Sequence, residues 1–131
     1  MTARPLRRAL TSLALATSVL TASACRNAEA IEHVRQLTGG EPSRGAAAIG
    51  RYGCGSCHDI PGIRNARSTV GPPLAGIANR TYLAGRIANS PADMMQWIQH
   101  PQKLEPGTAM PEMQVTEQDA RDITAYLYLQ R

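Results

Sequence analysis

The stretch Cys54-Gly55-Ser56-Cys57-His58 decides the fold that this 131-residue sequence predicts. Two cysteines three positions apart, followed directly by histidine, form the C-x-x-C-H pattern of covalent c-type haem attachment. The spacing suits this chemistry, because the two thiols lie about one helical turn apart and can each add to a haem vinyl group. His58 is then carried beneath the porphyrin, where its imidazole can bind the iron. The stretch therefore predicts a domain built around a haem that cannot dissociate.

Three other uses of a C-x-x-C pair compete with haem attachment: half of a zinc site, a thioredoxin-like redox pair and a short disulfide. A zinc site needs four ligands, and neither a second C-x-x-C nor an H-x-x-x-H follows in the sequence. A thioredoxin pair needs a βαβ context, and the sequence shows none. The motif and its surroundings together favour the haem.

The composition also suits a domain that encloses a cofactor. Aromatic residues are limited to one tryptophan and four tyrosines, with no phenylalanine, and a buried porphyrin would supply the missing apolar bulk. Nine prolines and eleven glycines indicate short helices joined by ordered loops. No stretch alternates apolar and polar residues convincingly over the length of a strand. We therefore expect an all-α fold of short helices around a covalently bound haem, with little or no sheet.

Residues 1–24 have the features of a secretory signal peptide. Three arginines precede an apolar run over residues 10–20, which is too short to span a bilayer stably, and Ala22-Ser23-Ala24 is a small-residue cleavage pattern. Removing the three arginines takes the formal net charge from +4 to +1, and two haem propionates would take it to about −1. We therefore expect export to the bacterial periplasm, and the high isoelectric point does not indicate a nucleic-acid partner.

Cys25 follows the expected cleavage point and is a candidate for lipidation. Residues 20–25 form an imperfect lipobox, because Ala22 occupies the position where a large aliphatic residue is usual. The alternative is ordinary cleavage that leaves Cys25 near a free terminus. An unpaired thiol is a liability in an exported protein, so we favour a membrane anchor through Cys25. Residues 25–42 are interpreted as a tether, a linker or an extra short helix, and residues 43–131 as the haem domain.

Helix signals occur at three places in the expected domain. Ser43 is expected to cap a helix that runs through Tyr52 to the haem motif. Ser90-Pro91-Ala92-Asp93 predicts a middle helix, which Pro101 ends. Thr116-Glu117-Gln118-Asp119 predicts the last helix. The expected apolar faces are Met94, Trp97 and Ile98 on the middle helix, and Ala120, Ile123, Tyr126 and Leu127 on the last.

Met110, within Pro106-Gly107-Thr108-Ala109-Met110-Pro111, is the favoured candidate for the second axial position of the iron. A thioether is a soft donor that raises the potential, and the two prolines stiffen the loop that would hold it. The alternative is that Met110 only fills the core, as most methionines do. Rival ligands are Met94, Met95, Met113 and His100. A filled position indicates electron transfer, whereas an open one indicates ligand binding or peroxide chemistry.

From residue 43 to residue 131 the sequence resembles the class I c-type cytochromes. Its parts follow the family's order: a helix, the cysteine-histidine motif, a Gly-Pro loop, a middle helix, the Pro-Gly-Thr-x-Met-Pro loop and a C-terminal helix ending in a Tyr-Leu pattern. The resemblance implies an all-α fold with one haem c in a crevice and one haem edge exposed. It also supports Met110 as the second ligand.

The resemblance further implies roles for residues around the haem. The carbonyl of Pro72 would accept a hydrogen bond from the imidazole of His58, which fixes the ring orientation. A desolvated propionate needs a partner, and Arg80 matches the basic residue that supplies it. The other matched positions are Leu74 and Trp97, which would pack on the haem, and Thr108, near the same propionate. Gly45 or Ala46 would meet Tyr126 where the first and last helices cross.

The sequence departs from the family's pattern in two ways. The first helix of the family often carries a large aromatic residue at this crossing, where Ile49 or Gly50 stands here. The usual lysine-rich ring around the haem edge is absent, with Lys103 the only lysine in the sequence. This departure puts strongly acidic partners in doubt.

These observations predict an exported monohaem cytochrome c that transfers single electrons through a haem bound by His58 and Met110. Its expected partners are redox proteins that dock briefly at the haem edge: a dehydrogenase, a cytochrome complex or a terminal oxidase. A second interpretation is an enzyme or gas sensor in which the sixth position opens. A third is the haem subunit of a larger redox enzyme, with the same chemistry and a fixed partner.

Overall fold

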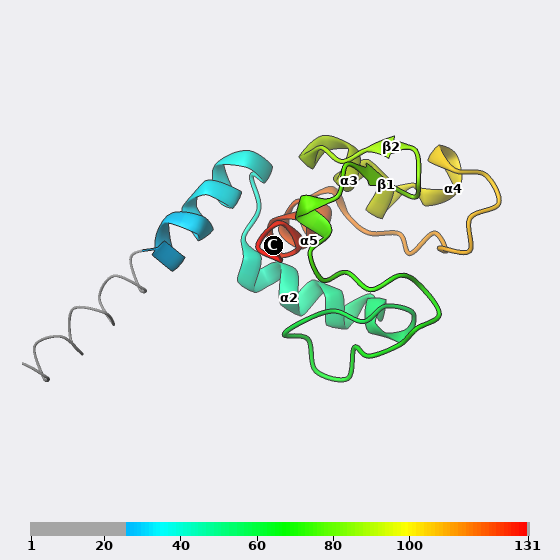
Figure 1. Ribbon diagram of the computed structural model, residues 1–131, viewed down its shortest axis with the longest axis horizontal. Coiled ribbons are helices and arrows are strands. Elements are labelled where there is room, and N and C mark those ends of the chain that lie inside the picture. Colours follow the sequence, from blue (N-terminus) through cyan, green and yellow to red (C-terminus); the bar gives the residue numbers. More distant parts are fainter. Residues whose placement is uncertain (1–25, 131) are drawn as a thin grey trace, which may run out of the picture. The chain divides into compact units, whose positions relative to one another are not determined.

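The computed structural model describes residues 26–130 (Figure 1). The expected signal peptide and Cys25 lie outside these residues. The chain divides into two units, with the boundary between residues 32 and 33, inside a helical segment over residues 26–38. No helix among the described residues is both long and apolar enough to cross a membrane.

The second unit is built almost entirely of helices and loops. Its elements are α2 (Pro42–Arg51), η1 (Cys54–Ser56), η2 (Ile77–Asn79), β1 (Tyr82–Leu83), β2 (Ile87–Ala88), α3 (Pro91–Gln99), α4 (Pro101–Leu104) and α5 (Glu117–Tyr128). The two strands pair antiparallel, with Leu83 opposite Ile87. The all-α prediction is therefore confirmed, since this short hairpin is the one sheet in the described part of the chain.

The helix α2 begins at Pro42, and the predicted cap at Ser43 is wrong. The N-cap is Glu41, whose side chain makes no capping hydrogen bond. Proline suits the first helical position, because its φ is already helical and the N–H that it lacks has no partner inside the helix. Ser43 therefore lies within the first turn, where its hydroxyl donates to the carboxylate of Glu41 over 3.2 Å.

The caps of α3 and α5 are confirmed. The hydroxyl of Ser90 accepts from the N–H of Asp93 at 3.1 Å, and that of Thr116 accepts from the N–H of Asp119 at 3.2 Å. Pro101 ends α3 as expected, but it also starts the short helix α4, which the sequence did not suggest. Of the expected apolar faces, Met94, Ile98, Ala120, Ile123 and Leu127 are buried, while Trp97 and Tyr126 are partly buried.

The helix α5 is the centre of this unit and contacts both α2 and α3 (Figure 1). It lies directly against α2 at Gly45, where an added Cβ would lie 2.0 Å from the carbonyl oxygen of Asp122 and 3.0 Å from the Cβ of Tyr126. The predicted meeting of Gly45 with Tyr126 is thus confirmed. Only glycine allows the two backbones to come so close.

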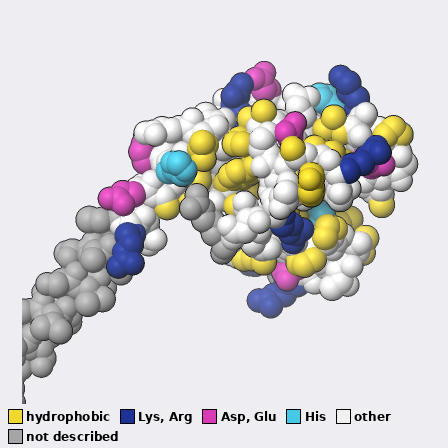
Figure 2. Space-filling view, turned by 45° about the horizontal axis from the view of Figure 1, so that its top comes forward, with side chains coloured by type: hydrophobic (Ala, Val, Ile, Leu, Met, Phe, Trp, Pro, Cys, Tyr) yellow, Lys and Arg dark blue, Asp and Glu magenta, His cyan; other side chains and the backbone are white. Residues whose placement is uncertain are grey.

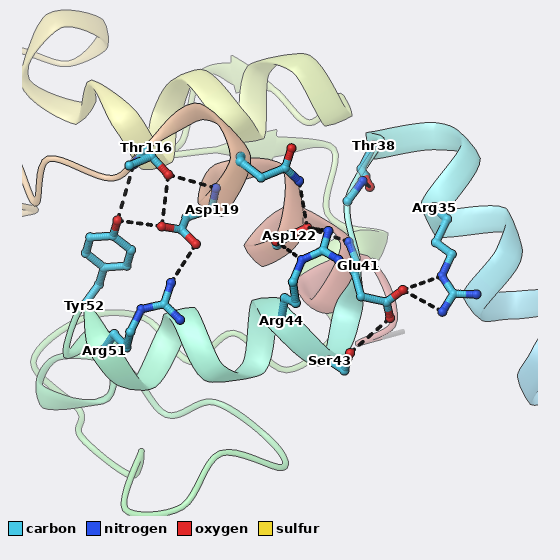
Figure 3. A network of polar contacts seen from close by, with 12 residues as sticks. Arg35, Thr38, Glu41, Ser43, Arg44, Arg51, Tyr52, Thr116, Asp119 and Asp122 are labelled. Atoms are coloured by element: carbon cyan, nitrogen blue, oxygen red, sulfur yellow. Dashed lines mark hydrogen bonds and ion pairs between the residues drawn. The ribbon is translucent and has the colours of Figure 1, made fainter.

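The crossing of α2 and α5 is also held by the carboxylate of Asp122 (Figure 3). This side chain is 2% exposed. It accepts hydrogen bonds from the backbone N–H of Glu41 (2.7 Å), from Nε and Nη2 of Arg44 (2.7 and 2.9 Å) and from the amide of Gln118 (3.1 Å). Burial by itself would raise the pKa of Asp122, but these donors bring it below the ordinary value. The carboxylate is therefore ionised and satisfied inside the fold.

A second carboxylate of α5 links the other end of α2 (Figure 3). Asp119 accepts from the hydroxyl of Tyr52 at 2.8 Å and forms an ion pair with Arg51 at 2.7 Å. The hydrogen bond from Tyr52, with others from Thr116 and Arg51, holds the pKa of Asp119 below its usual range. Both ends of α2 are thus tied to α5, which fixes the position of the cysteine motif that follows α2.

Candidate haem site

A cavity of about 420 Å³ lies next to the core, within the size range of pockets that hold small molecules and cofactors. Its lining comes from the cysteine motif, from residues 70–84, from residues 105–115 and from the facing sides of α2, α3 and α5. Apolar side chains dominate it, among them Ile49, Ile60, Ile77, Leu83, Ile98 and Leu127. The space therefore suits a large apolar group.

The cysteine motif reaches the cavity through a tight backbone turn. Gly53 precedes η1 with a φ of 67°, and the N–H groups of Cys57 and His58 both donate to the carbonyl of Cys54, at 3.2 and 3.0 Å. Cys54, Cys57 and His58 consequently line the same cavity. The two thiols are not bonded to each other, and burial raises the pKa of the Cys54 thiol, so it is protonated at neutral pH.

The imidazole of His58 is held in one orientation. Its Nδ1 lies 2.7 Å from the carbonyl oxygen of Pro72. A carbonyl can only accept, so Nδ1 carries the proton and Nε2 keeps the lone pair that a metal requires. Gly71 lies against the ring, because an added Cβ there would be 2.6 Å from its Cε1. The sequence had not suggested this role for Gly71.

The structure brings the predicted site residues to one place. Pro72, Leu74, Arg80, Trp97, Thr108 and Met110 all line the cavity with the cysteine motif. The guanidinium of Arg80 donates to the carbonyl of Pro73. This hydrogen bond holds the guanidinium at the wall of the cavity. Of the rival ligands, Met94 and Met113 also line the cavity, whereas Met95 and His100 are not part of its lining.

These residues fit a covalently attached haem, since two thiols, an imidazole with an available lone pair and a thioether surround one apolar space. The family profile described as Cytochrome c matches residues 42–128, well over half of the chain. The chain belongs to the cytochrome c family. This membership confirms the resemblance drawn from the motifs and implies a haem c with iron, covalently attached, in a haem-binding electron carrier. No curated protein and no solved structure gave a significant match.

The methionine loop of this cytochrome c, residues 105–115, contains neither helix nor strand. The N–H of Thr108 donates to the carbonyl of Glu105 at 3.0 Å, and the N–H of Met110 approaches the hydroxyl of Thr108 at 3.4 Å. The side-chain amide of Gln102 on α4 also donates to this loop. Nothing in the sequence pointed to Gln102, because a glutamine in a short helix carries no motif.

The charges of the cytochrome are scattered over its surface. Figure 2 shows Lys, Arg, Asp and Glu side chains spread across one face, with hydrophobic side chains between them. Glu105, which lines the cavity, forms an ion pair with Arg86. Three apolar side chains of the cavity lining are also exposed to solvent, Val70, Tyr82 and Met113.

Proposed function

We propose that this cytochrome is an exported monohaem electron carrier in which His58 and Met110 are the two axial ligands of the iron. The observation that carries the proposal is that these two side chains, from loops 52 residues apart in the sequence, line one apolar cavity together with Cys54 and Cys57. When bound, the haem supplies a one-electron couple between ferric and ferrous iron. The protein holds this couple in place and excludes water from it.

Different residues of the cavity have different roles in holding the haem. The thiols of Cys54 and Cys57 hold the group covalently, and the bond from His58 to the carbonyl of Pro72 keeps Nε2 directed to the metal. The apolar lining lowers the local dielectric. Among the polar lining residues, Arg80 and Thr108 are the groups that would partner a propionate, since a buried carboxylate requires donors.

The identity of the sixth ligand separates an electron carrier from an enzyme or sensor. A thioether that stays on the iron blocks external ligands, whereas an open position admits them. Met94 and Met113 line the same cavity and are the methionines against which Met110 must be tested. Met94 is 2% exposed and belongs to the core, so Met113, which is 38% exposed, is the better control for substitution.

The test is the visible spectrum of the haem-loaded protein, oxidised and reduced, with and without CO. We expect a low-spin spectrum with the far-red sulfur-to-ferric-iron band and no change with CO. Met110→Ala should keep the haem, lose that band, bind CO and lower the reduction potential by on the order of 100 mV. Met113→Ala should behave as the wild type. A wild type that is high-spin or binds CO, or a Met110→Ala variant with an unchanged potential, would contradict the proposal.

We propose a free or tethered carrier in preference to a fixed subunit of a larger redox enzyme. The charges support this choice, because on the face seen in Figure 2 they are interspersed among the hydrophobic side chains and offer many weak polar contacts. A dehydrogenase, a cytochrome complex or a terminal oxidase would then dock at the exposed haem edge. The absence of a lysine ring predicts that such docking depends only weakly on salt.

We also propose that the protein is exported to the periplasm and anchored through a lipid on Cys25. The support comes from the sequence alone: a basic start, a short apolar run and a small-residue cleavage pattern directly before Cys25. Cys25→Ser should move the haem protein from the membrane fraction to the soluble periplasmic fraction, because the acyl chains have no other attachment point. Unchanged fractionation would remove lipidation from the proposal and leave the electron-carrier function untouched.

A further inference from the structure

The side chain of Gln102 makes two hydrogen bonds to the loop that carries Met110. Its amide nitrogen donates to the carbonyl of Thr108 at 2.7 Å and to that of Met110 at 2.9 Å. An amide NH₂ has two donors, and both are used on this one loop. Gln102 is partly buried, so these bonds are shielded in part from competing water.

The same residue is bonded to the loop on the other side of the methionine. The backbone N–H of Gln102 donates to Oε1 of Glu112 at 3.2 Å. Positions 108, 110 and 112 of the loop are therefore all bonded to a single residue of α4. Within the loop, the N–H of Met110 has only a long contact of 3.4 Å with the hydroxyl of Thr108.

We infer that Gln102 is a positioning residue that keeps the thioether of Met110 on the iron. The inference rests on the proposed ligation by His58 and Met110. A methionine side chain has three rotatable bonds, so its sulfur stays in place only if its backbone does. The two bonds from Gln102 fix that backbone at Thr108 and Met110. Without them the loop opens more often, and an external ligand reaches the sixth position in the opened state.

The test compares Gln102→Leu with Gln96→Leu in the haem-loaded protein. Leucine is of comparable bulk to glutamine, although one atom shorter, and has no hydrogen-bond donors. Gln96 is an exposed residue of α3 that supplies a matched control. We expect the apparent affinity of the ferric protein for imidazole to rise about tenfold in Gln102→Leu, because a ligand that needs the open state gains in proportion to its population. The far-red band should weaken. Gln96→Leu should leave both unchanged.

Amide hydrogen exchange gives a second readout that does not depend on the iron ligands. Exchange of the backbone N–H groups of Thr108 and Met110 should quicken in Gln102→Leu, while exchange in α5 should stay the same. Gln102→Asn is the milder variant, since its shorter side chain cannot reach both carbonyls, and an intermediate imidazole affinity is expected. If Gln102→Leu does not fold, the imidazole affinity and the loop exchange of Gln102→Asn test the inference.

The outcomes separate this inference from the proposed function. If the wild type shows the sulfur band and the Gln102 variants keep wild-type imidazole affinity and loop exchange, Gln102 is not a positioning residue. If the wild type lacks the band, ligation by Met110 fails first, and the inference fails with it. Faster exchange in α5 as well as in the loop would show a general loss of stability and would also overturn the inference.

Discussion

The crossing of α2 with α5 and the loop around Met110 are built in opposite ways. At the crossing, the backbone of Gly45 lies directly on that of Asp122, and the buried carboxylate of Asp122 is bonded by four donors. The methionine loop has no regular structure, and one side chain, Gln102, donates to its carbonyls. Several independent contacts therefore hold the crossing, whereas the methionine loop depends on a few hydrogen bonds.

This contrast extends to the two proposed iron ligands. His58 follows directly from the crossing through α2 and η1, and its ring is fixed by the carbonyl of Pro72 and the backbone of Gly71. Met110 lines the same cavity from the lightly held loop. Stability is therefore concentrated on the histidine side, and any opening of the iron site should start on the methionine side.

The largest loss of stability is expected from Gly45→Val, which changes the crossing of α2 with α5. An added Cβ would lie 2.0 Å from the carbonyl oxygen of Asp122 and 2.6 Å from its carbon, and backbone atoms cannot move aside as a side-chain end can. We expect destabilisation by about 3 kcal/mol or more, or loss of cooperative folding. The measurement is denaturant unfolding followed by circular dichroism.

Gly50→Ala is the matched control for this substitution. Gly50 lies in the same helix, and an added Cβ there meets nothing within 4 Å. Alanine should stabilise α2 by about 0.5–1 kcal/mol, because it restricts the unfolded chain more than glycine does. If Gly45→Val unfolded at the same denaturant concentration as the wild type, the close crossing would not exist in solution.

The sequence predicted those parts of the molecule that local signals determine. The cysteine motif, the caps at Ser90 and Thr116 and the small residue at the crossing are each recognisable within a few residues. The cap at Ser43 was wrong because Pro42, one position earlier, is better suited to begin a helix. The restart of a helix at Pro101 was missed for the related reason that a proline both ends one helix and can begin the next.

The parts that the sequence could not predict depend on residues that are distant in the chain. Asp122 appears in the sequence as one more charged residue of an amphipathic helix, and its partners Glu41 and Arg44 lie about 80 residues earlier. A buried carboxylate becomes recognisable only when its donors are placed around it. Gln102 is similar, because its bonds to the methionine loop follow from how α4 is placed and from no motif.

Asp122→Asn should lower the free energy of unfolding less than Gly45→Val does, and this loss should depend on pH. Asparagine keeps the shape but loses the charge that Arg44 and the N–H of Glu41 require, so we expect destabilisation by about 2–3 kcal/mol at pH 7. Glu117→Gln, which removes an exposed ion pair with Arg121 and one of the two acidic charges of the first turn of α5, should cost less than about 1 kcal/mol. Urea unfolding of both variants at pH 7 measures this difference.

The pH dependence follows from the lowered pKa of Asp122 in the folded state. A carboxyl whose folded pKa lies below its unfolded value of about 3.9 stabilises the fold fully above that value. This contribution is lost as the pH falls through about 4 toward the folded pKa. The gap in unfolding free energy between wild type and Asp122→Asn should therefore be constant from pH 7 to about pH 5 and narrow below it. A gap that stayed the same down to pH 3 would show that the charge of Asp122 does not hold α2 to α5. The crossing would then depend on the close backbone contact at Gly45 and on the bonds of Asp119.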